Sequence, residues 1–125
     1  MKALLLVDHG SRRAEANRNL DRAAEVVREQ APELLVFTAH MELSAPDIDA
    51  AFAEAAKAGV EELVVFPWFL ANGRHVREDI PRLCAAAGEV HGIAHHVSPP
   101  FGIHAQLAQL ALIRADLLPG RKEMP

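Results

Sequence analysis

Apolar residues along this chain fall into short blocks that predict four β-strands. Residues 3–7 are five consecutive apolar residues, which is typical of a strand buried on both faces of a parallel sheet. Residues 34–39 and 63–66 repeat this pattern, and residues 89–97 form a weaker, mixed block. Because Gly92 interrupts that last block, we expect it to lie at an edge of the sheet.

Between the strands, apolar residues recur at the spacing of amphipathic helices. The expected helices span residues 14–30, from Ser44 to the glycine at 59, from about 77 to the glycine at 88, and 103–117. Ser44 is expected to cap the second helix, with Pro46 in its first turn. Gly88 is expected to end the third helix, and Pro119 with Gly120 to end the last one.

Alternation of strand and helix predicts an α/β fold with a single four-stranded parallel sheet and helices on both faces. We expect the flavodoxin-like strand order 2-1-3-4, because the unbroken apolar character of residues 3–7 suits a central strand. One domain is expected over residues 1–118, followed by a loose tail over 119–125.

Composition narrows the class of protein. The 125 residues are 50% hydrophobic and carry a formal net charge of −4, which argues against a nucleic-acid surface. The single cysteine, Cys84, excludes an internal disulfide and suits a reducing compartment. Neither the N-terminal apolar run, which stops at Asp8, nor any later stretch is long enough for a signal peptide or a membrane span. We therefore expect a soluble, cytoplasmic protein without a membrane partner.

Polar side chains gather where the expected strands end. The first strand runs directly into Asp8, His9, Gly10, Ser11 and Arg12. Ligands of open α/β sheets bind outside the carboxyl ends of the strands, so this cluster is a candidate site. Taken alone it fits an ordinary strand-to-helix turn equally well, with Gly10 bending the chain and Ser11 capping the next helix.

Two further strand ends add to the candidate site. His40 and Glu42 follow the second strand, and a loop containing His75 follows the third. In the order 2-1-3-4, His9 and His75 face each other across the switch point, with Glu42 beside them. Two imidazoles and one carboxylate bind a divalent transition metal weakly and leave coordination positions open. Either histidine alone is better explained as a helix cap or a backbone hydrogen-bonding group.

The remaining histidines are weaker candidates. His91, His95 and His96 are expected on the surface of the edge strand, too far apart or on opposite faces to share an ion. His40 is expected to support the site or simply to pack. Whether His104 lines the site stays open at this point.

Four segments, in order and spacing, resemble the small CbiX-type (sirohydrochlorin) chelatases over almost the whole chain. They are residues 7–12 (VDHGSR), 40–46 (HMELSAP), 69–81 (FLANGRHVREDIP) and 99–104 (PPFGIH). The third segment is the most specific. Asp8 departs from the pattern, since the family more often has glycine there, and Ala105 stands where proline is common. Whether Asp8 joins the site is open.

The resemblance implies an enzyme that inserts Co²⁺ or Fe²⁺, in some members Ni²⁺, into a sirohydrochlorin-type tetrapyrrole without an organic cofactor. It implies a homodimer, with His9 and His75 as the catalytic, metal-handling pair and Glu42 as the nearby carboxylate. An imidazole can ligate the ion or accept a pyrrole proton. We expect Ser11, Arg12, Arg74 and Arg77 to bind the carboxylates of the tetrapyrrole. Residues 68–70 either form an apolar wall for the ring or simply pack under the loop.

Two other functions remain open from the sequence. The first is a carrier that binds metal or tetrapyrrole without inserting one into the other. A phosphate- or nucleotide-binding domain is the weaker alternative, because no glycine-rich fingerprint follows the first strand.

Overall fold

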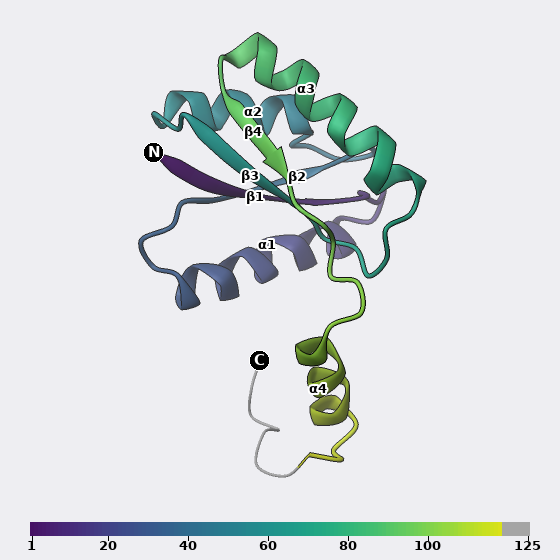
Figure 1. Ribbon diagram of the computed structural model, residues 1–125. Coiled ribbons are helices and arrows are strands. Elements are labelled where there is room, and N and C mark those ends of the chain that lie inside the picture. Colours follow the sequence, from purple (N-terminus) through teal and green to yellow (C-terminus); the bar gives the residue numbers. More distant parts are fainter. Residues whose placement is uncertain (119–125) are drawn as a thin grey trace.

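The computed structural model describes residues 1–118, apart from the side chain of His75. A four-stranded parallel sheet forms its centre, in the order β2-β1-β3-β4 (Figure 1). The strands are β1 (Lys2–Asp8), β2 (Val36–His40), β3 (Glu62–Pro67) and β4 (Ala94–Val97). The predicted fold class and strand order are therefore confirmed, with β4 at one edge.

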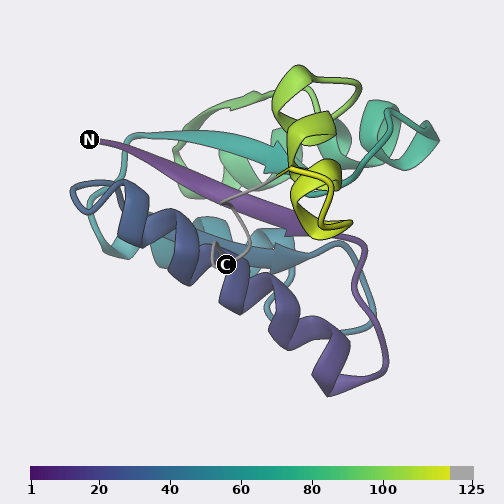
Figure 2. The same ribbon diagram turned by 90° about the horizontal axis from the view of Figure 1, so that it is seen from below.

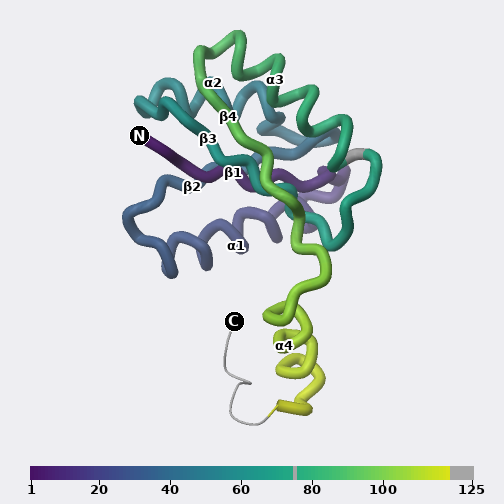
Figure 3. The backbone as a smooth tube through the Cα atoms, viewed as in Figure 1, coloured from purple at the N-terminus to yellow at the C-terminus, as the bar shows by residue number. Residues whose placement is uncertain are grey.

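Helices lie on both faces of the sheet. α1 (Ala14–Gln30) covers one face, and α2 (Ile48–Lys57) with α3 (Ile80–His91) covers the other (Figure 1). A short π-helical turn, η1 (His75–Asp79), leads directly into α3. α4 (Ala105–Arg114) projects away from the sheet at the end of an extended connection (Figure 3).

Hydrophobic side chains form two clusters, one on each face. Leu5 and Val65 point toward α2 and α3 and pack with residues such as Phe52. Leu6 points the other way and packs with Leu20 of α1. Because successive side chains of a strand alternate between faces, a central strand covered by helices on both sides must be apolar throughout. The unbroken apolar run of β1 has this origin.

Cys84 lies in the larger cluster, fully buried on the inner side of α3. Burial raises the pKa of its thiol from 9.0 to about 12, because a thiolate would lose its hydration there. We expect a thiol reagent at pH 8 to leave Cys84 unmodified in the native protein and to modify it once the protein is unfolded. Titration of the thiol with and without denaturant checks this, and rapid labelling of the native protein would contradict the buried position.

The second helix begins later than its sequence suggests. Asp47, not Ser44, caps α2, with the backbone N–H of Ala50 donating to Asp47 Oδ1 over 2.8 Å. The chain before it is still turning, because the N–H of His40 donates to the carbonyl of Pro46 over 2.8 Å. The prediction of a Ser44 cap, with Pro46 inside the helix, is therefore wrong.

The third helix continues beyond its expected end. α3 passes through Gly88 and stops at Gly92, which adopts a left-handed conformation with φ 68°. A Cβ atom at Gly88 would lie 2.8 Å from the carbonyl oxygen of Ile93, so this glycine allows the chain leading into β4 to approach the helix. The expected strand over residues 89–97 is accordingly too long, since β4 starts at Ala94.

The last helix also differs from its prediction. α4 ends at Arg114, so Leu117 lies beyond it. The expected stop at Pro119 and the expected tail over 119–125 lie outside the described residues.

Seen from below, α1 runs along the β2 side of the sheet and leaves β3 uncovered on that face (Figure 2).

Within residues 1–118, no helix combines the length and the apolar character needed to cross a lipid bilayer.

Candidate functional site

The candidate site is built at the carboxyl edge of the sheet, where β1 and β2 end side by side. Their parallel register pairs Asp8 with His40, and backbone hydrogen bonds continue past the strands. The N–H of Met41 donates to the carbonyl of Asp8 over 2.9 Å, and the N–H of Glu42 to that of His9 over 3.2 Å. The two loops are thereby held together, and His9 Nε2 lies 3.6 Å from Glu42 Oε2.

Gly10 makes this close approach possible. It has φ +93°, and a Cβ atom built on it would lie 1.9 Å from the carbonyl oxygen of Glu42. No other residue type fits in that space, and L-residues rarely adopt that backbone conformation. Gly10 therefore lets the His9 loop lie directly against the Glu42 loop.

Next to His9 and Glu42 in the sequence lies a pair of polar side chains, one buried and one partly buried. His40 is 2% exposed, and its Nδ1 lies 2.5 Å from Asp8 Oδ1. Asp8 and His40 share one face of the sheet because they are register partners in neighbouring parallel strands. The Asp8 carboxylate is thus directed to His40. This pair was missed from the sequence, because the contact depends on the register between the two strands.

Ser11 shapes the turn that starts α1. Its hydroxyl oxygen accepts the N–H of Arg13 over 3.1 Å, and its own N–H donates to Asn17 Oδ1 over 2.9 Å. The amide nitrogen of Asn17 donates back to the carbonyl of Ser11 over 2.8 Å. These are the local hydrogen bonds expected of a helix start, although Arg13 rather than Ser11 occupies the capping position itself.

Three predicted cationic residues remain exposed near the strand ends. Arg12 follows β1, while Arg74 and Arg77 lie where the loop after β3 enters η1. Arg74 pairs with Glu78 over 3.4 Å, and the N–H of Arg77 donates to the carbonyl of Gly73 over 3.0 Å. All three residues are exposed, so their guanidinium groups are accessible to an anionic ligand.

His75 is the first residue of η1, and its side chain lies outside the described part of the structure. Val76, inside the turn, is buried, and Ile80, the first residue of α3, belongs to the larger core cluster. His75, expected in the loop after the third strand, thus begins the π-helical turn that leads into α3. The predicted approach of its imidazole to His9 stays a prediction.

The model of the CbiX family matches residues 3–117, nearly the whole chain. The chain belongs to the CbiX family. Its similarity to a sirohydrochlorin ferrochelatase, chloroplastic, of Arabidopsis thaliana is 42% identity over 102 residues, which are 81% of this chain and 45% of that protein. A sirohydrochlorin cobaltochelatase of Methanopyrus kandleri is 40% identical over 83 residues, 66% of this chain and 58% of that protein.

Solved structures agree with this membership. A Marinobacter aquaeolei VT8 protein assigned to CbiX of cobalamin (vitamin B12) biosynthesis has a TM-score of 0.78 and 30% identity, covering 94% of this chain and 98% of its own. The sirohydrochlorin chelatase SirB of Bacillus subtilis subspecies spizizenii, solved in complex with cobalt, has a TM-score of 0.83 and 25% identity, covering 92% and 50%. This CbiX-family chain spans about half the length of SirB and of the plant relative.

Three further histidines of this CbiX-family chain, His91, His95 and His104, have other partners. His91 belongs to the end of α3, not to the edge strand as expected, and its Nε2 lies 3.0 Å from Asp49 Oδ1. The ring of His95 packs edge-on against Phe52, with ring centres 6.2 Å apart. His104 caps α4 by accepting the N–H of Gln106 over 3.0 Å. These contacts are structural and leave His9 as the described histidine that lies beside Glu42.

The predicted apolar wall is divided between two environments. Trp68 packs edge-to-face against Phe66 and Phe101, with ring centres 5.9 and 4.8 Å apart. Phe69 packs against the larger core cluster, whereas Leu70 is 69% exposed. Ordinary packing therefore accounts for the two aromatic residues, and only Leu70 is left as an exposed apolar surface.

Among the side chains that the structure describes, no three from His, Cys, Asp and Glu are arranged to hold a metal ion. His9 and Glu42 supply two potential donors, an imidazole nitrogen and a carboxylate oxygen, on the rim of the sheet. A site with few ligands leaves positions open for water or for a second ligand. Such a pair suits the temporary holding of an ion more than its permanent storage.

Proposed function

We propose that this chain is a chelatase that inserts Co²⁺ or Fe²⁺ into sirohydrochlorin or a closely related tetrapyrrole. The observation that carries the proposal is the juxtaposition of the His9 imidazole and the Glu42 carboxylate, 3.6 Å apart, at the ligand-binding edge of a CbiX-family sheet. Relatives named as ferrochelatase and cobaltochelatase support both the reaction and the two metals.

Metal insertion requires a group that takes up pyrrole protons and a group that attracts the cation. The His9 imidazole can accept a proton or ligate the ion, because one ring nitrogen of a neutral imidazole carries a lone pair. Glu42 adds negative charge beside it and can pass protons to solvent, since its side chain is exposed. We assign His75 the same kind of role on the opposite side of the macrocycle, on the strength of its position after β3.

The peripheral carboxylates of the tetrapyrrole require cations on an acidic protein. We assign this role to Arg12, Arg74 and Arg77, which are exposed near the strand ends. Ser11 contributes through its hydroxyl, which accepts the N–H of Arg13 and still has a proton to donate.

Imidazole and carboxylate ligands accommodate cobalt, iron and nickel alike, so metal availability decides among them. The single buried cysteine, Cys84, suits a reducing cytoplasm.

The test is an anaerobic optical assay in which metal-free sirohydrochlorin is mixed with protein and with Co²⁺, Fe²⁺ or Ni²⁺ separately. We expect protein-dependent spectral change with Co²⁺ or Fe²⁺, and its loss in the double variant His9→Ala/His75→Ala. Unchanged rates in the double variant would remove these residues from the mechanism. The proposed chelatase activity itself would be contradicted if the spectrum changed equally without protein. It would also be contradicted if the protein caused no spectral change with any of the three ions.

We also propose that the chain works as a homodimer. α4 lies apart from the sheet (Figure 1). Leu107 and Leu110 of this helix line an open groove of about 530 Å³ together with Phe101. α1 leaves β3 uncovered on the face nearest to α4 (Figure 2). A second copy would cover apolar surface on both elements and would enclose a ligand that is large for one small domain.

The dimer is tested by mass in solution. We expect the native chain to have about twice its 13.6 kDa monomer mass, and Leu110→Lys to lower the measured mass toward the monomer, because a charge replaces an apolar contact. Size-exclusion chromatography with light scattering measures this. Val90→Lys, at an exposed position of α3, is the matched control and should leave the mass unchanged. A native protein of monomer mass would contradict the proposal.

A further inference from the structure

Leu43 combines two properties that packing alone does not explain. Its φ is +70°, in the left-handed region, where a branched side chain is strained. Its side chain is nevertheless exposed, with 51% of the residue accessible to solvent. Strained backbone of this kind persists only where the surroundings fix it, and it is concentrated at ligand-binding sites.

The surroundings of Leu43 do fix its backbone. Backbone hydrogen bonds hold Met41 to Asp8 and Glu42 to His9, and the N–H of His40 donates to the carbonyl of Pro46 across the base of the loop. The loop is therefore tied to β1 before Leu43 and closed on β2 after it. Leu43 lies at the exposed turn between these ties, next to Glu42.

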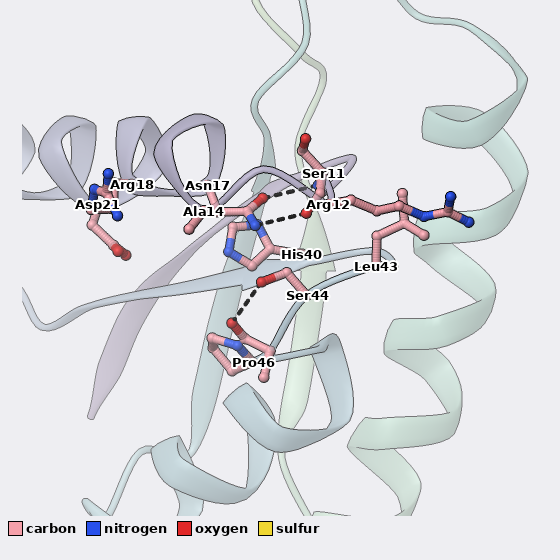
Figure 4. A pocket seen from close by; sticks show the side chains of 11 residues that line it. Ser11, Arg12, Ala14, Asn17, Arg18, Asp21, His40, Leu43, Ser44 and Pro46 are labelled. Carbon is pink, nitrogen blue, oxygen red and sulfur yellow. Dashed lines mark hydrogen bonds between the residues drawn. The ribbon is translucent and has the colours of Figure 1, made fainter.

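The side chain of Leu43 lines the same hollow as Arg12, close to the ends of β1 and β2. Figure 4 shows it beside the side chain of Arg12, with both directed toward α3. Leu43 also contributes to two hollows that share the loop from Leu43 to Pro46, with volumes of about 230 and 430 Å³. An apolar group thus lines one hollow together with the cation Arg12 and the other together with Glu42.

We propose that Leu43 is a substrate-contact residue that packs against the flat face of the tetrapyrrole while Arg12 pairs with a peripheral carboxylate. The proposal rests on the proposed function and extends it to a residue outside the metal-handling group. A flat conjugated ring offers apolar faces and a charged rim, and Leu43 with Arg12 offers the complementary pair. The backbone strain at Leu43 is then the cost of presenting a leucine where glycine or asparagine would fit more easily.

The test separates binding from stability with variants at this one position. Leu43→Gly and Leu43→Asn suit the left-handed conformation but remove the apolar contact, whereas Leu43→Met keeps an apolar side chain. Leu35→Asn is the matched control, since Leu35 is also exposed but precedes β2 at the opposite edge of the sheet. The dissociation constant of metal-free sirohydrochlorin is measured by fluorescence titration, together with the Tm and the solution mass of each variant.

We expect the dissociation constant to rise about fivefold in Leu43→Gly and Leu43→Asn and to stay near the native value in Leu43→Met and Leu35→Asn. The Tm of Leu43→Gly should equal or exceed that of the native protein, because the strain is relieved. The proposal would be overturned if the dissociation constants of Leu43→Gly and Leu43→Asn both stayed within twofold of the native value. It would also be overturned if the weaker affinity came with a lower Tm or with loss of the dimer.

The titration uses no metal, so its outcome is independent of insertion. Binding without insertion would count against the chelatase activity and still decide the role of Leu43. A native protein that binds no metal-free sirohydrochlorin would overturn both.

Discussion

His9→Ala is expected to slow metal insertion by about 10²- to 10⁴-fold, the range typical of losing a positioned proton-transfer group. The His9 imidazole is the described group that lies within 3.6 Å of the Glu42 carboxylate at the strand ends. Without it, Glu42 alone would have to hold the ion and accept protons. The measurement is the initial rate in the anaerobic optical assay at saturating Co²⁺ and sirohydrochlorin.

The fold should survive this substitution, because the His9 side chain is partly exposed and contributes no core packing. Far-ultraviolet circular dichroism and Tm should therefore match the native protein. His96→Ala, at an exposed position of β4, is the matched control and should retain the native rate. A His9→Ala protein that keeps the native fold and the native rate would show that His9 takes no part in the reaction.

Gly10→Ala is expected to be both unstable and inactive. The new Cβ would lie 1.9 Å from the carbonyl oxygen of Glu42, so one of the two loops must move. The positive φ of +93° adds a conformational cost for alanine. Together these effects should lower the free energy of unfolding by about 2 to 4 kcal/mol, which corresponds to a Tm roughly 10 °C lower.

Gly59→Ala separates the two causes. Gly59 also has a positive φ, +86°, but nothing lies within 4 Å of a Cβ built on it. It should therefore lose only the conformational part, about 1 kcal/mol, and retain activity. Thermal unfolding of both variants, with the insertion rate at a temperature where both are folded, makes the comparison. Equal stability of the two variants would mean that the loops at His9 and Glu42 are not closely apposed.

Much of the architecture follows directly from the pattern of apolar residues. A central strand covered on both faces must be apolar at every position, and residues 3–7 are the clearest such run. Placing that strand in the middle brings the residues after the first and second strands together. The contact between His9 and Glu42 was therefore accessible from the sequence.

The errors arose where tertiary contacts override local preferences. Gly88 resembles a helix stop, but its missing side chain serves the approach of the Ile93 carbonyl, and Gly92 ends the helix instead. Ser44 resembles a cap, but the bond from His40 to Pro46 keeps the chain outside the helix until Asp47. In both cases the outcome depends on a contact with another segment of the chain. The helix-capping preference of a single residue cannot predict such a contact.

The pair formed by Asp8 and His40 illustrates a different limit. Each residue alone is ambiguous, and only the parallel register makes them neighbours. From the sequence, Asp8 was interpreted only as a departure from the family resemblance and His40 only as a supporting or packed residue, and the register brings the two into contact. The contact between the two side chains joins the ends of β1 and β2, just before His9 and Glu42 in the sequence.

The most direct test of the central claim is the amount of metal-loaded product formed per protein molecule. Purified protein is incubated anaerobically with Co²⁺ and a large excess of sirohydrochlorin, and the product is followed by its absorption spectrum. We predict that product accumulates well beyond the concentration of protein, as repeated insertion at the strand-end site requires. Product that stops at one equivalent per site, or that forms no faster than without protein, would contradict the account.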